Sequence, residues 1–97
     1  MKVNIVGHSF EVTPPIKESI EKKLQRLENH CDNIISVDVH FAIEKLKQTV
    51  KGTVHVKGNS YHADASADTV YHAIDHLVDM LDRQLKRHRE KQSDHRE

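Results

Sequence analysis

The chain has 97 residues, with 15 lysines and arginines against 15 aspartates and glutamates, so its formal net charge is zero. This length predicts one domain with one hydrophobic core, too small for a cleft between domains. Apolar runs never exceed four residues, far below the roughly 20 that cross a bilayer, and the start lacks the apolar stretch of a secretory signal. Since Cys31 is the single cysteine, no internal disulfide can form, which suits a reducing cytoplasm. We therefore expect a cytoplasmic protein without membrane contact.

The zero net charge is a sum of unequal segments. Residues 1–57 carry +2, residues 58–82 carry −5 without any lysine or arginine, and residues 83–97 carry +3. Protonation of several of the nine histidines would make the chain cationic below about pH 6.5. Such asymmetry indicates a polyanionic partner. The alternative is an ordinary solvated helix end.

The first half of the chain predicts a strand, a helix and a second strand. Val3 and Ile5 alternate with polar neighbours in a short strand that ends at Gly7-His8. Thr13 followed by two prolines is typical of a helix start, because proline in the first turn misses no hydrogen-bond donor. One apolar stripe continues this helix to about His30: Ile16, Ile20, Leu24 and Leu27. Strict alternation over residues 35–43 predicts the second strand, with these side chains on its core face: Ile35, Val37, Val39, Phe41 and Ile43.

The second half predicts a hairpin of two strands and a long helix. A charged loop over residues 44–48 leads into a third strand over residues 50–57, and Gly58-Asn59 is a two-residue hairpin signal. A fourth strand over residues 61–67 has small alanines on one face, which would let a helix lie close to the sheet. Asp68 or Thr69 can cap the second helix, which we expect to fray beyond Lys91. Its apolar stripe is Val70, Ile74, Leu77, Val78, Leu81 and Leu85.

The element order β-α-β-β-β-α predicts an α+β fold. A strand–helix–strand start implies a parallel pair, and the following strands form an antiparallel meander. Since each helix has one apolar stripe and each strand one strongly apolar face, both helices should cover the same face of a four-stranded mixed sheet. The prediction is a two-layer sandwich with one polar sheet face. We assign residues 1–91 to this domain and residues 92–97 to a short flexible tail.

The two helices separate their charges by flank. In the first helix four basic side chains lie on one side of the apolar stripe, and Glu18, Glu21 and Glu28 lie on the other, where Lys17 is the exception. These basic side chains are Lys22, Lys23, Arg26 and His30. In the second helix Arg83, Arg87 and Lys91 form a row that His76 extends, and the other flank carries Asp75, Asp79 and Asp82. If the basic flanks face each other, they form a cationic groove that fits a phosphate backbone. The alternative is an ordinary charged surface with pairs four residues apart.

Aromatic side chains offer little for base stacking. The chain has two phenylalanines, two tyrosines and no tryptophan, and we place Phe41, Tyr61 and Tyr71 on core faces. Readout of single strands by stacking is therefore disfavoured. Recognition of folded RNA by its shape and backbone is the better fit.

The sequence gives no support for an enzyme or a cofactor. His72 and His76 stand four residues apart on one helical face and could bind zinc, but a third ligand would have to come from elsewhere. His30-Cys31 could suggest a base and a nucleophile, but neighbours on a helix point in different directions. We interpret these histidines as surface residues and Cys31 as a small apolar residue at a helix end. We expect neither a metal nor a catalytic residue.

Six motifs in matching order cover nearly the whole chain. They are Val3-x-Ile5-x-Gly7, Lys23-x-x-Arg26-Leu27, His55-Val56-x-Gly58, His62-Ala63-x-Ala65, Tyr71-x-Ala73-Ile74-Asp75-x-Leu77 and Arg83-Gln84-Leu85-x-Arg87-His88-Arg89-x-Lys91. With the element order, they resemble the ribosome hibernation-promoting factor family, which includes the ribosome-associated inhibitor also called protein Y.

The resemblance implies a fold related to the double-stranded-RNA-binding domain, with an extra leading strand. It implies binding to 16S rRNA of the small ribosomal subunit in the channel of messenger and transfer RNA, at the A and P sites, which stops translation in stationary phase. The residues that match the family's basic surface are Lys23, Arg26, Arg83, Arg87, Arg89 and Lys91, and helix position adds Lys22 and Lys86.

The length resembles the short type of this family. The resemblance implies a factor that acts with ribosome modulation factor to form paired 100S ribosomes, and we expect a monomer off the ribosome. A different class remains open: a protein-interaction module that docks a partner through its polar sheet face or its aspartate-rich helix flank.

Overall fold

The computed structural model describes residues 1–31 and 33–94, with side chains to residue 87. Its elements follow the predicted order β-α-β-β-β-α. They are β1 (Lys2–His8), α1 (Pro14–His30), β2 (Ile34–Glu44), β3 (Lys47–Val56), β4 (Asn59–Ala67) and α2 (Val70–Asp94). The second helix thus continues to Asp94, three residues beyond Lys91, after which fraying is expected.

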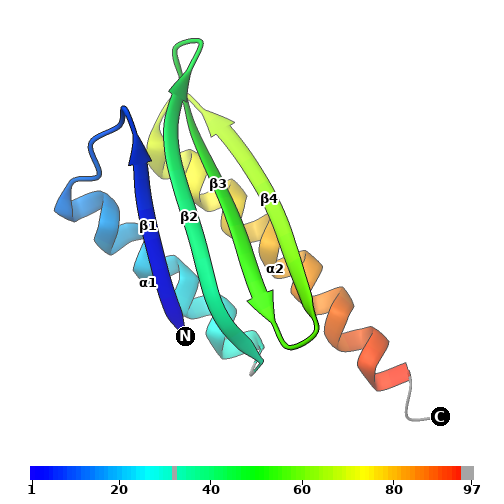
Figure 1. Cartoon of the computed structure of the whole chain (residues 1–97). Helices are drawn as coiled ribbons and strands as arrows, with labels where there is room; N and C mark the ends of the chain where they lie inside the picture. The colour runs from blue at the N-terminus through cyan, green and yellow to red at the C-terminus, as the bar shows by residue number, and fades with distance from the viewer. Residues whose placement is uncertain (32, 95–97) are drawn as a thin grey trace.

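The four strands form one mixed sheet in the spatial order β1-β2-β3-β4. β1 pairs with β2 in parallel, and the two later pairings are antiparallel. Both helices cover the same face of this sheet (Figure 1). The predicted two-layer α+β sandwich is therefore confirmed.

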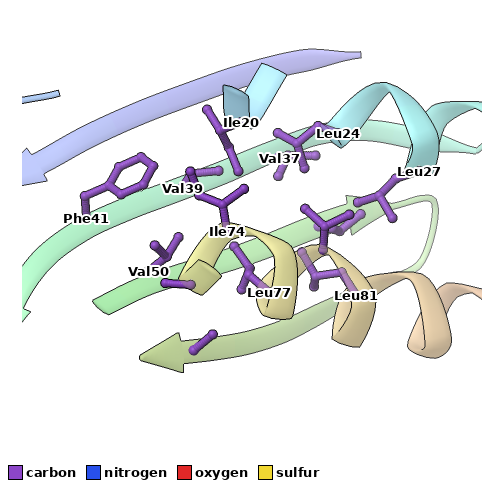
Figure 2. Close-up of a cluster of buried hydrophobic side chains, with 14 of the residues drawn as sticks. Ile20, Leu24, Leu27, Val37, Val39, Phe41, Val50, Ile74, Leu77 and Leu81 are labelled. Atoms are coloured by element: carbon purple, nitrogen blue, oxygen red, sulfur yellow. The ribbon is translucent and has the colours of Figure 1, made fainter. Parts of the chain in front are cut away.

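The core lies between the sheet and the two helices. The apolar stripe of α1 and that of α2 point into it, where they meet the inward residues of β2 and β3 (Figure 2). Gly52 of β3 allows α2 to approach closely, because a Cβ atom there would lie 3.1 Å from Cδ2 of Leu77. Ala65 on β4 is small for the same reason and is buried. Cys31, at the C-terminal end of α1, is buried in this core as expected.

The helix starts follow the predicted caps in different ways. Thr13 is the N-cap of α1 but makes no side-chain capping bond. At the start of α2, the backbone N–H of His72 donates to Oγ1 of Thr69 at 3.2 Å. Of the two candidates, Thr69 is therefore the cap.

Both hairpin turns differ from their predicted positions. The loop expected over residues 44–48 is a two-residue turn, because β2 and β3 continue until Glu44 pairs with Lys47. Its central residues Lys45 and Leu46 have φ values of 49° and 70°, the left-handed pair that matches the twist of a hairpin. The other turn lies one residue earlier than predicted, at Lys57-Gly58, where Gly58 adopts the positive φ of 84°.

Two apolar residues predicted for the core face of β2 are exposed. Ile35 is 60% exposed because the pairing register shifts between Ile34 and Ser36, and Ile34 packs against the core in its place. A bulge of this kind exchanges the faces of neighbouring residues. Ile43 is 53% exposed and lies beyond the last residue of β2 that pairs with β1.

The uncovered face of the sheet is polar, as predicted, and its side chains form a hydrogen-bonded row across all four strands. Nδ2 of Asn4 donates to Oδ1 of Asp38 at 2.8 Å, and the second carboxylate oxygen lies 2.9 Å from Nε2 of His55. Nδ1 of His55 lies 3.1 Å from Oγ of Ser60. The hydrogen bonds from Asn4 and then His55, with the charge of the nearby histidines, lower the pKa of Asp38.

A substitution at Gly7 tests the close approach at the end of β1. A Cβ atom at this position would collide with the backbone carbonyl oxygen of Phe10. We expect Gly7→Ala to lower the free energy of unfolding by about 1–3 kcal/mol, measured by urea denaturation. Gly52→Ala is the comparison and should cost less, because the nearest atom would lie 3.1 Å away in the Leu77 side chain and not in the backbone. Equal stability of Gly7→Ala and the parent chain would contradict this packing.

Candidate nucleic-acid interface

The predicted basic residues with described side chains lie on the helical layer, away from the sheet. α1 supplies Lys22, Lys23 and Arg26, and α2 supplies Arg83, Lys86 and Arg87. None of the six is buried. The backbones of Arg89 and Lys91 belong to α2, but their side chains lie outside the described part of the chain.

Three ion pairs join α1 to α2 along the line where the helices meet. Nζ of Lys23 lies 2.8 Å from Oδ1 of Asp75. Nη2 of Arg26 donates to Oδ1 of Asp79 at 2.6 Å. Nδ1 of His30 lies 2.9 Å from Oδ1 of Asp82, a pair that is ionic when the imidazole is protonated.

We call these three pairs the interhelix ladder. The paired positions advance in the same direction along both helices, by steps of three and four residues, so α1 and α2 run parallel and each helical turn carries one pair. All the ladder side chains remain partly exposed to solvent.

The ladder corrects the predicted cationic groove. The basic flank of α1 faces the acidic flank of α2, not its basic flank. The assignment of charges to flanks is confirmed, but the proposed pairing of the flanks is wrong. In two parallel helices with the same arrangement of flanks, the basic side of one meets the acidic side of the other, which also lowers their electrostatic energy.

Of the six predicted cations with described side chains, four remain outside the ladder: Lys22, Arg83, Lys86 and Arg87. None of them has an ion-pair partner among the described side chains. All four are exposed. Helical spacing places Arg83 and Arg87, four residues apart, on the side of α2 that points away from the sheet. The arrangement is therefore an exposed, positively charged helical face, and not a groove.

An open hollow of about 590 Å³ lies where α1 passes the first turn of α2. Its lining residues are Pro15, Glu18, Ser19, Lys22, Lys23, Arg26 and Tyr71. Tyr71 is 46% exposed, so its predicted place in the core is wrong. Helix position explains the error, because residue 71 lies about 100° from Val70 but only about 20° from Val78, at the edge of the apolar stripe.

The described side chains form neither a metal site nor a membrane-spanning helix. Among the described side chains, no group of three or more histidine, cysteine, aspartate or glutamate residues could hold a metal ion. In the part of the chain that the structure describes, no helix is long and apolar enough to cross a membrane.

Comparison with models of protein families identifies the family of this chain. The model of the family described as "Sigma 54 modulation protein / S30EA ribosomal protein" matches residues 3–93. The chain belongs to this family. Its members are ribosome hibernation factors and not enzymes, so the resemblance found in the sequence is confirmed.

Individual relatives match the sequence of this chain over nearly its full length. A ribosome hibernation promoting factor of Azotobacter vinelandii is 49% identical over 92 residues, which cover 95% of this chain and 86% of the relative. The factor of the same name from Escherichia coli K12 is 39% identical over 95 residues, covering 98% of this chain and 100% of the relative.

Solved structures show the same fold. A ribosomal subunit interface protein from Coxiella burnetii superposes with a TM-score of 0.85 at 30% identity, covering 92% of this chain and 98% of that one. The N-terminal domain of Thermus thermophilus Protein Y superposes with a TM-score of 0.83 at 30% identity, covering 90% of this chain and 98% of that one.

The ladder makes a prediction for binding to polyanions. Replacing two aspartates together, Asp75→Asn with Asp79→Asn, leaves Lys23 and Arg26 without their partners. We expect affinity for heparin to rise about 5-fold or more, while the free energy of unfolding falls by no more than about 2 kcal/mol, since exposed ion pairs contribute about 0–1 kcal/mol each. Heparin-affinity titration and urea denaturation measure the two effects.

The matched control is Glu44→Gln with Asp64→Asn. It makes the same change of net charge on other parts of the surface, and it also releases Lys51 from its pair with Glu44. Equal gains in heparin affinity for both double variants would show that net charge alone is responsible, against a specific role of the ladder.

Proposed function

We propose that this chain binds 16S rRNA of the small ribosomal subunit in the channel of messenger and transfer RNA, at the A and P sites, and so stops translation in stationary phase. The observation that carries the proposal is the placement, on one exposed helical face, of cations without an ion-pair partner among the described side chains, foremost Lys22, Arg83 and Arg87. A phosphate backbone gains affinity from each cation that neutralises one of its charges.

The proposed mechanism is steric occlusion without chemistry. The fold is elongated, with extents of 49 × 23 × 18 Å, and its helical face supplies phosphate contacts along one side. A rigid body held there excludes messenger and transfer RNA from the space they share. Backbone contacts of this kind fix position and carry no sequence information, which suits a site on folded rRNA.

We infer further that the protein, a monomer off the ribosome, acts with ribosome modulation factor to promote paired 100S ribosomes in the cytoplasm. Support comes from the relatives that carry the name ribosome hibernation promoting factor, one of which this chain covers completely.

A protein-interaction module is the second candidate function. Its aspartate-rich flank is no longer a suitable docking surface, because Asp75, Asp79 and Asp82 are occupied by α1. The uncovered polar face of the sheet, with the row from Asn4 to Ser60, is the surface that favours it.

Salt titration separates the two functions. For binding to purified small subunits, we expect a steep fall of log affinity with log salt concentration. Arg83→Ala and Arg87→Ala should each reduce the magnitude of this slope by about one, because each removes one phosphate contact. Filter binding over a series of salt concentrations measures the slope.

Lys51→Ala is the control, since it removes one positive charge from the opposite face of the sheet and should leave the slope unchanged. A flat slope, with both arginine variants binding like the parent, would exclude the rRNA interface. A loss of binding confined to Lys51→Ala would favour docking through the sheet.

Formation of paired ribosomes needs its own measurement. We expect sucrose gradients of stationary-phase ribosomes to show a 100S peak when the chain and ribosome modulation factor are present, and to lose it with the Arg83→Ala, Arg87→Ala double variant. Silenced 70S ribosomes without a 100S peak would show that the chain inhibits translation but does not promote pairing.

A further inference from the structure

We propose that the hollow between α1 and the first turn of α2 binds one unpaired RNA nucleotide, with its base stacked on Tyr71 and its phosphate held by Lys22. This inference rests on the proposed function and deepens it. In addition to the contacts of the helical face with the RNA backbone, it assigns one contact with a base.

The exposed ring of Tyr71 is the first observation. The structure describes all four phenylalanine and tyrosine rings. Phe41 is buried, Phe10 stacks on it with 5.5 Å between centroids, and Tyr61 packs against the core. Tyr71 alone is exposed, and its hydroxyl has no hydrogen-bond partner among the described residues. The ring is not part of the core, and nearly half of the residue's surface is available for a ligand.

The charges around the ring are the second observation. Three of the lining side chains are cationic, and Lys22 has no ion-pair partner among those described. Lys23 and Arg26 are directed to Asp75 and Asp79 by the interhelix ladder, which holds them beside the hollow. Lys22 is therefore the cation of this hollow that is best placed to bind a phosphate.

The combination identifies the chemical class of the ligand. A flat apolar ring beside an ammonium group that has no ion-pair partner among the described side chains suits a molecule that joins a planar base to an anion, and every nucleotide does so. Glu18, the one carboxylate of the lining, repels a phosphate but accepts hydrogen bonds from a base amino group or a 2′-hydroxyl. Because the base must leave its own stack to reach the ring, the ligand is a bulged or loop nucleotide.

Binding to purified small subunits gives the first test. Tyr71→Ala should weaken this binding about 5-fold or more, the loss expected when one base loses its aromatic partner. Tyr71→Phe should keep the parent affinity, because stacking uses the ring and not the hydroxyl. Tyr61→Phe is the matched control, since it changes a tyrosine that packs against the core. Thermal unfolding checks that all three variants keep the fold.

Intrinsic fluorescence gives a direct second reading. The chain has two tyrosines and no tryptophan, so in the Tyr61→Phe variant Tyr71 is the only emitter. A short RNA duplex with one bulged adenosine should quench this emission and bind more tightly than the same duplex fully paired.

The results discriminate between this site and the proposed function. Parent-like binding of Tyr71→Ala, equal losses for Tyr71→Ala and Tyr71→Phe, or emission that bulged RNA does not quench would each overturn the nucleotide site, while subunit binding that still depends on Arg83 would leave the proposed function standing. Failure of the parent chain to bind small subunits would instead reject the proposed function, and the quenching measurement would still decide the site.

Discussion

The charged contact between two parallel helices is the constraint on which the rest of this surface depends. β1 and β4 point in the same direction in the sheet, and each is followed by a helix that returns across the same face (Figure 1). The helices are therefore parallel, and their similarly arranged flanks bring opposite charges together in the interhelix ladder. An antiparallel pair would have placed flanks of like charge against each other.

The ladder divides the basic residues into two kinds. Lys23 and Arg26 are held in defined positions by carboxylates, whereas Lys22, Arg83 and Arg87 extend into solvent without such partners among the described side chains. Exposed ion pairs are weak, so a phosphate can replace an aspartate at low cost. The same surface thus has cations without a carboxylate partner among the described side chains, and cations for which an anionic ligand must compete with Asp75 and Asp79.

Much of the fold followed from local patterns, and the errors have specific causes. The strict alternation of β2 predicted its strand correctly but not the bulge beside Ile34, because a bulge depends on pairing with β3. The tight turn at Lys45-Leu46 was missed since neither residue is a typical left-handed residue. Tyr71 was misplaced because it lies at the edge of the apolar stripe, about 20° from the buried Val78. The parallel course of the helices was implied by the strand directions.

The sequence by itself determined the order of elements, the two apolar stripes, the polar sheet face and the sign of each helix flank, because helix and strand periodicity fix which side chains share a face. It also determined the family, through motifs spread along the chain. Only the tertiary structure decided which flank faces which, and hence that Asp75 and Asp79 hold two of the predicted cations. Contacts between residues 52 or 53 positions apart depend on how both helices pack on the sheet. The neutral total charge does not reveal them.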